Sequence, residues 1–101
     1  MKLNDLIKTT QIKVPDTDLV IEVKTELSWL EYLEYAKIED LTKRGKFLLT
    51  KIIVSWNLED EEGKALPITE DIVGRLPANI GIPLAEKITE IVSVEEVKKK
   101  S

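Results

Sequence analysis

Four consecutive acidic residues, at positions 59 to 62, are the side chains best suited to chemistry in this sequence. Carboxylates could hold a cation, act as a general acid and base, or form a charged contact surface. A calcium loop of the EF-hand type has its first ligand at position 1 and a glycine at position 6. Counting back from Gly63 puts Leu58, which has no side-chain oxygen, at the first position. We therefore expect no metal ion and interpret Glu59, Asp60, Glu61 and Glu62 as a turn in water, because Gly63 can adopt positive φ.

Apart from these acids, the sequence has few residues of the types that usually perform catalysis. The sequence contains no cysteine and no histidine, which removes thiol nucleophiles, Cys/His zinc sites and the usual general base. A catalytic acid pair needs burial or a raised pKa, and the sequence indicates neither. Gly74 and Gly81 are too isolated to form a phosphate-binding loop. We predict that the protein is not an enzyme and has no cofactor; an enzyme using carboxylates, lysine or Ser/Thr is the alternative.

Three aromatic residues are candidates for protein contact. Trp29, Tyr32 and Tyr35 are spaced by three residues, so they drift around a helix and at least one should be exposed. Tyrosine and tryptophan are frequent anchors of protein interfaces. The candidate interaction residues are therefore Trp29, Tyr32, Tyr35 and the acids 59–62, and burial of the aromatic residues between subunits predicts a homo-oligomer. The alternative is that the aromatic residues belong to the core, with one tyrosine at the surface.

Charge and hydropathy exclude two classes of partner. The net charge is −4, whereas phosphate contact requires a basic surface. The basic segments 41–46 and 98–100 are short, so no nucleic-acid partner is expected. No stretch approaches the ~20 apolar residues of a membrane span, and the first residues lack the apolar core of a signal peptide. We expect a cytosolic protein that does not bind membranes.

The pattern of apolar residues predicts an α+β fold, a mainly helical single domain with a small N-terminal β-hairpin. The 101 residues are enough for one domain, 1–101. Residues 1–10 are weakly patterned and are interpreted as a flexible arm, with a short helix as the alternative. Residues 11–25 alternate apolar and polar side chains around a turn at Pro15, which is typical of a β-hairpin. The helical part spans 28–92, and 93–101 form a charged tail.

Helix signals divide the region from 28 to 92. Ser28 and Glu31 form a capping box, which predicts a helix over 28–38. Apolar residues with helical spacing predict a second helix over 40–56, although its β-branched run is also compatible with a strand. Thr69 should cap a short helix over 69–76. Pro83 suits the first turn of a final helix.

A longer phrase carries a family resemblance. It comprises Trp56, Asn57, Leu58, Asp60, Glu61, Gly63, Lys64, Leu66 and Pro67, followed by Leu76 and Pro77. Together with the preceding "LVIEVKTELSWLEYLEYAKI", it resembles the small tail assembly chaperones of long-tailed bacteriophages and prophages, over residues 12–92. In physical terms, Trp56 and Leu58 should tie the end of the long helix to the core. The acids and Gly63 turn the chain, and Leu66 and Pro67 return it to the next helix.

The resemblance implies a function in virion morphogenesis. Such chaperones coat the long, helical tape measure protein before tail-tube subunits polymerise around it. The implied partners are the tape measure protein and the tail tube protein, and the implied location is the cytoplasm of the host bacterium. The family has no catalytic residue to carry over. The alternatives are a structural adaptor of the head–tail joint or tail, and a small acidic inhibitor of a host nuclease.

Overall fold

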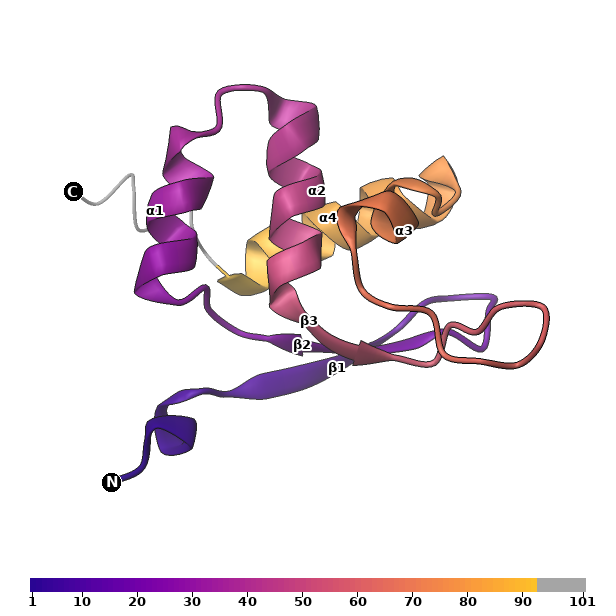
Figure 1. The fold of residues 1–101 in the computed structure, drawn as a ribbon, viewed down its shortest axis with the longest axis horizontal. Coiled ribbons are helices and arrows are strands. Elements are labelled where there is room, and N and C mark those ends of the chain that lie inside the picture. Colours follow the sequence, from indigo (N-terminus) through magenta and orange to yellow (C-terminus); the bar gives the residue numbers. More distant parts are fainter. Residues whose placement is uncertain (93–101) are drawn as a thin grey trace.

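A three-stranded antiparallel sheet forms the base of the molecule, and helices cover one of its faces (Figure 1). The computed structural model describes residues 1–92, so the charged tail predicted for 93–101 lies outside the described residues. The strands are β1 (Thr9–Lys13), β2 (Val20–Lys24) and β3 (Ile53–Trp56), in the order β1-β2-β3. The α+β class is confirmed. The sequence predicted only a two-stranded hairpin, whereas the sheet has a third strand, β3, paired with β2.

The hairpin of β1 and β2 follows the alternation of its side chains. Ile21 and Val23 point toward the helices and have no exposed surface, whereas Glu22 lies on the outer face. There, its carboxylate accepts hydrogen bonds from the hydroxyls of Thr9 and Ser55, at 2.9 and 3.3 Å. Thr9 pairs with Lys24, so β1 begins inside the segment predicted as an arm. The sheet is therefore apolar toward the helices and polar on the other side.

Helix α1 (Trp29–Lys37) begins at the predicted cap. The hydroxyl of Ser28 accepts a hydrogen bond from the N–H of Glu31 at 3.1 Å, and the Glu31 carboxylate accepts one from the N–H of Ser28 at 2.9 Å. This reciprocal pair satisfies two N–H groups that the first turn leaves free. The same carboxylate lies 2.8 Å from Nζ of Lys24 in β2. One glutamate thus fixes the start of α1 against the sheet.

The helix predicted over 40–56 is wrong at its C-terminal end. Helix α2 (Leu41–Ile52) is capped by the Asp40 carboxylate, and β3 follows it without an intervening loop. Ile53 pairs with Val23 and Trp56 pairs with Ile21, with a register shift between Glu22 and Val23. A strand forms here because β-branched residues suit a pleated surface and because β2 offers an edge whose backbone groups need partners. Pairing with β2 therefore outweighs the helical spacing.

The last two helices also differ from their predicted bounds. Helix α3 (Glu70–Gly74) is shorter than predicted, although Thr69 caps it as expected. Helix α4 (Ala78–Val92) begins well before Pro83, which lies inside it. The N–H groups of Ile80 and Gly81 donate to the carbonyl of Pro77 at 2.9 and 2.8 Å, so the helix is started there. Because proline has no N–H, the carbonyl of Asn79 lacks its ordinary helical donor.

The core lies between the sheet and α2 and α4. Its side chains with at most 2% exposed surface come from β2, α2 and α4, namely Ile21, Val23, Leu48, Ile52 and Ile88. The first residues contribute nothing to it. They contain a 3-10 helix (Leu3–Leu6) with no buried residue, and they extend away from the body of the molecule in Figure 1. The segment of residues 1–7 is called the N-terminal arm below.

Glu31 provides a test of stability against pH. Partial burial raises its pKa, but the hydrogen bond and charge of Lys24 and the hydrogen bonds of Ser28 outweigh this effect, so the pKa lies below its ordinary value of 4.5. A lowered carboxyl pKa stabilises the fold above the unfolded-state pKa, and this contribution is lost as pH falls through the folded-state pKa. Glu31→Gln keeps the cap but removes the charge. We expect it to cost about 0.5–1 kcal/mol at neutral pH.

Urea denaturation at neutral pH and at a pH well below 4.5 measures this contribution. The difference between Glu31→Gln and the unmodified protein should shrink to near zero in acid, because protonated glutamate and glutamine are both uncharged. Asp71→Asn is the matched control, since the Asp71–Arg75 pair is about three-quarters exposed. It should have little effect at either pH. An equal cost for Glu31→Gln at both pH values would contradict the assignment.

Candidate protein-binding surface

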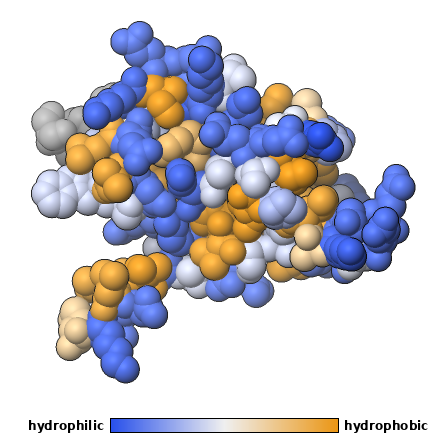
Figure 2. Space-filling view, in the orientation of Figure 1, coloured by the Kyte–Doolittle hydropathy of each residue, from blue (hydrophilic) through white to orange (hydrophobic). Residues whose placement is uncertain are grey.

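The outer side of α1 presents large apolar side chains to solvent. Trp29 is 82% exposed, Leu30 67% and Leu33 45%; these three residues are the α1 apolar face. Orange patches at the upper left of Figure 2 lie over this helix. The helix has apolar residues on more than one side and only one side meets α2, so some of these residues are left exposed. Side chains of this size and type are the usual anchors of protein interfaces.

The predicted aromatic residues separate between surface and core. Trp29 is exposed, Tyr32 is half-buried against the core, and Tyr35 is buried with 7% exposure. The guanidinium of Arg44 lies 5.1 Å from the centre of the Tyr35 ring, and its Nε donates a hydrogen bond to the carbonyl of Ile38. Tyr35 and Arg44 thus join α1 to α2. Among these three aromatic residues the exposed one is the tryptophan, whereas the alternative placed one tyrosine at the surface.

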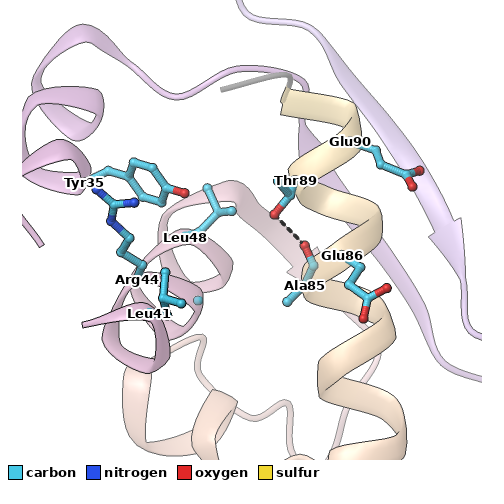
Figure 3. A pocket seen from close by; sticks show the side chains of 9 residues that line it. Tyr35, Leu41, Arg44, Leu48, Ala85, Glu86, Thr89 and Glu90 are labelled. Carbon is cyan, nitrogen blue, oxygen red and sulfur yellow. Dashed lines mark hydrogen bonds between the residues drawn. The ribbon is translucent and has the colours of Figure 1, made fainter. Parts of the chain in front are cut away.

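A groove of about 460 Å³ lies between α2 and α4 (Figure 3). Leu41, Leu48 and Ala85 supply apolar surface, and Tyr35 and Arg44 stand on one side. On the opposite side, Glu86 and Glu90 of α4 point away from Tyr35. Thr89 donates its hydroxyl hydrogen to the carbonyl of Ala85 at 2.8 Å, so this hydroxyl is used within the helix. The groove can receive an apolar side chain.

The four predicted acids form a tight, exposed turn. One Asp60 carboxylate oxygen accepts hydrogen bonds from the N–H groups of Glu62 and Lys64, at 2.8 and 3.0 Å. The N–H of Asp60 donates to the carbonyl of Lys64 at 2.8 Å, and Gly63 has φ of 83°. Glu59 and Ala65 form an isolated β-bridge at the base. Asp60 therefore organises the turn, while Glu59, Glu61 and Glu62 are exposed.

Trp56 joins the two ends of the segment that contains the acidic turn. Its indole Nε1 donates a hydrogen bond to the carbonyl of Leu66 at 2.9 Å, and the N–H of Leu66 donates to the carbonyl of Leu58 at 3.0 Å. Trp56 and Leu58 are partly buried against the core, and Leu66 is half-buried, whereas Pro67 is exposed. The segment 56–67 thus returns on itself and leads toward α3. Trp56 occupies a strand, not the predicted helix end.

Asn57 has a structural role that sequence reasoning missed. Its amide oxygen accepts a hydrogen bond from the N–H of Val20 at 2.8 Å, and its amide nitrogen donates to the carbonyl of Asp18 at 2.7 Å. The side chain therefore joins the end of β3 to the start of β2. In the sequence, Asn57 stood out only because it follows Trp56 in the quoted phrase. That position did not indicate that its side chain would contact Asp18 and Val20.

Calcium is expected to leave the melting temperature unchanged. Within residues 1–92, the structure contains no group of three or more His, Cys, Asp or Glu side chains placed to hold a metal ion. Asp60, the best placed acid, already accepts two backbone hydrogen bonds. Differential scanning fluorimetry with calcium and with a chelator tests this prediction, and Asp60→Asn is the control because it keeps the turn. A rise in melting temperature at micromolar calcium, lost in Asp60→Asn, would contradict it.

No protein-family model, no curated protein and no solved structure matches this chain. The resemblance to phage tail assembly chaperones therefore stays a prediction that rests on the quoted residues. Among the described residues 1–92, no helix is both long enough and apolar enough to cross a membrane. The candidate surface consists of the α1 apolar face and the groove beside it.

Proposed function

We propose that the protein is a non-catalytic tail assembly chaperone of a long-tailed phage, which binds the tape measure protein in the cytoplasm of the host bacterium. The observation that carries this proposal is the α1 apolar face, in which Trp29, Leu30 and Leu33 are exposed on one short helix. The resemblance supplies the identity of the partner. The structure supplies a surface suited to it.

The α1 apolar face has the chemistry that an amphipathic partner helix requires. A helix binds through apolar residues at spacings of three and four, which meet a complementary apolar surface. Leu30 and Leu33 are three residues apart, and Trp29 and Leu33 are four apart, so the three lie on neighbouring turns. Glu34 and Lys37 are exposed on the same helix. These charges can keep the complex soluble while the apolar stripe of the partner is covered.

The experiment is co-expression with segments of a tape measure protein from the same genome, followed by a binding measurement on purified components. The unmodified chain should increase the soluble yield of the segments. Leu30→Glu should weaken binding about tenfold or more, which corresponds to about 1.4 kcal/mol, because it places a charge in the apolar contact. Leu30 is mostly exposed, so the variant should keep the melting temperature of the unmodified protein.

Asp71→Ala, at an exposed position of α3, is the control, and it should bind as the unmodified chain does. Equal binding by Leu30→Glu, with no gain in soluble yield of any segment, would contradict the proposal. Mass spectrometry of purified phage particles distinguishes a chaperone from a structural adaptor. A chaperone leaves before the tail is complete, whereas detection of the chain in mature virions at stoichiometric amounts would identify a structural adaptor.

A further inference from the structure

The outer edge of β1 is open along its whole length. The carbonyl of Lys8 accepts a hydrogen bond from Thr25 at 2.9 Å, and the N–H of Val14 donates to Leu19 at 3.0 Å. The backbone N–H and C=O groups of successive residues point alternately to the two sides of an antiparallel strand. Lys8 and Val14 direct theirs toward β2, so Thr9, Gln11 and Lys13 direct theirs toward the open edge. Within residues 1–92, no strand pairs with this edge. Neither proline nor glycine interrupts β1, so the edge is a template for another strand.

The N-terminal arm continues from this edge strand and contributes no residue to the core. Its large side chains are Met1, Leu3, Leu6 and Ile7, with 101, 73, 63 and 46% exposure. In Figure 2, they form the orange cluster that projects at the lower left. The backbone of Ile7 is extended, with φ of −97° and ψ of 112°. The arm therefore leads away from the β1 end at Thr9, not back along the sheet.

An apolar groove of about 660 Å³ lies at the opposite end of β1. It is bounded by Ile12, Val14 and Pro15 of the hairpin and by Ile80, Pro83 and Leu84 of α4. Asn79, whose carbonyl lacks its ordinary helical donor, also lines it. The β1 strand extends over about 17 Å, at ~3.4 Å per residue. Because the arm leaves from the other end, it cannot fill this groove in its own chain without reversing direction.

We propose that two copies of this chain pair through the free edges of β1, and that the N-terminal arm of each copy fills the groove of the other. Antiparallel pairing about a twofold axis at Gln11 sets Thr9 opposite the partner's Lys13 and uses all three outward residues of β1. The same register brings Leu6 and Ile7 alongside positions 16 and 15 of the partner subunit, beside its groove. The same twofold rotation thus places each arm in the groove of the other copy.

One charge contact fits this register, although the groove lining also carries Lys13 and Lys87 beside Asp16. The arm and its junction carry Lys2 and Lys8 against one acid, Asp5, whose carboxylate already accepts the N–H of Lys2 at 3.0 Å. Lys8 faces position 14 of the second copy, diagonal to the exposed Asp16, and diagonal neighbours in a sheet are within reach of long side chains. The pairing also adds backbone hydrogen bonds at residues 9, 11 and 13. This inference does not rest on the proposed function, since it uses neither the α1 apolar face nor the tape measure protein.

Sedimentation equilibrium over a range of concentrations tests the pairing. The unmodified chain should approach twice its monomer mass, whereas a chain lacking residues 1–7 and a Gln11→Pro variant should stay monomeric. Proline is tolerated at an edge where the N–H faces solvent, so Gln11→Pro should keep the fold, which circular dichroism checks. Leu30→Glu is the control and should remain dimeric, because it alters only the α1 apolar face.

Cross-linking tests the register. The chain has no cysteine, so Gln11→Cys introduces a single thiol. Directly opposite residues in a hydrogen-bonded antiparallel pair have Cα atoms about 5.5 Å apart, so a short bis-maleimide should join two copies of this variant. Ser55→Cys, on the same outer face but in β3, should not cross-link. A strict monomer at all concentrations would overturn the proposal, as would a dimer that survives Gln11→Pro and arm deletion but is lost in Leu30→Glu.

Discussion

Ile88→Ala should lower the free energy of unfolding by about 3 kcal/mol, the middle of the range for removing a large aliphatic side chain from a core. Ile88 has no exposed surface and lies in the middle of α4. The lost side chain leaves a cavity between α4 and the rest of the core, and close-packed surroundings relax only in part. Urea denaturation followed by circular dichroism measures the loss.

Ile82→Ala is the matched control, because it makes the same chemical change in the same helix. Ile82 is 60% exposed, so the substitution should change the free energy of unfolding by less than about 0.5 kcal/mol. Similar losses for both variants would mean that α4 does not pack through the Ile88 side. The pair thus tests the orientation of α4 independently of its helical propensity.

Trp56→Ala should destabilise the protein by about 2–4 kcal/mol, somewhat below the usual cost for a fully buried aromatic residue. The indole is half-buried, lies opposite Ile21 in the sheet, and donates a hydrogen bond to the carbonyl of Leu66. Its removal therefore loosens both β3 and the return of the chain toward α3. Thermal and urea unfolding of the purified variant give the magnitude.

The second tryptophan provides the comparison. Trp29 is 82% exposed, so Trp29→Ala should stay within about 0.5 kcal/mol of the unmodified protein. Trp56→Phe keeps an aromatic ring but loses the donor, and should cost about 1 kcal/mol. If Trp29→Ala were the more damaging change, the α1 apolar face would be buried in the folded molecule and could not serve as a binding surface.

Local signals predicted the elements that depend on local physics. The start of α1 could be predicted because Ser28 and Glu31 satisfy each other's backbone groups within four residues. The same is true of Thr69 at the start of α3, and of the alternation that places Ile21 and Val23 inside. Each of these outcomes depends on side chains near one another in the sequence, so no knowledge of the tertiary structure was needed.

The errors arose where distant segments decide the structure. Ile53 to Trp56 fit a helical stripe and a strand equally well, and the open edge of β2, more than 25 residues earlier, decides for the strand. Pro83 was placed at a helix start because of its own preference, yet the chain begins α4 at Ala78. The exposure of Trp29 could not be predicted either, because it depends on which side of α1 meets α2.

The direct passage from α2 into β3 restricts how this protein can change length. An extra residue between Ile52 and Ile53 would rotate α2 by ~100° relative to the strand and would exchange the two faces of β3. Buried side chains would then meet solvent on both elements at once. An extra residue in the turn at Asp60–Gly63 would neither rotate a helix nor shift a strand, since the tip of this turn is exposed. Homologous chains that differ in length should therefore keep the α2–β3 junction intact and gain or lose residues at this turn.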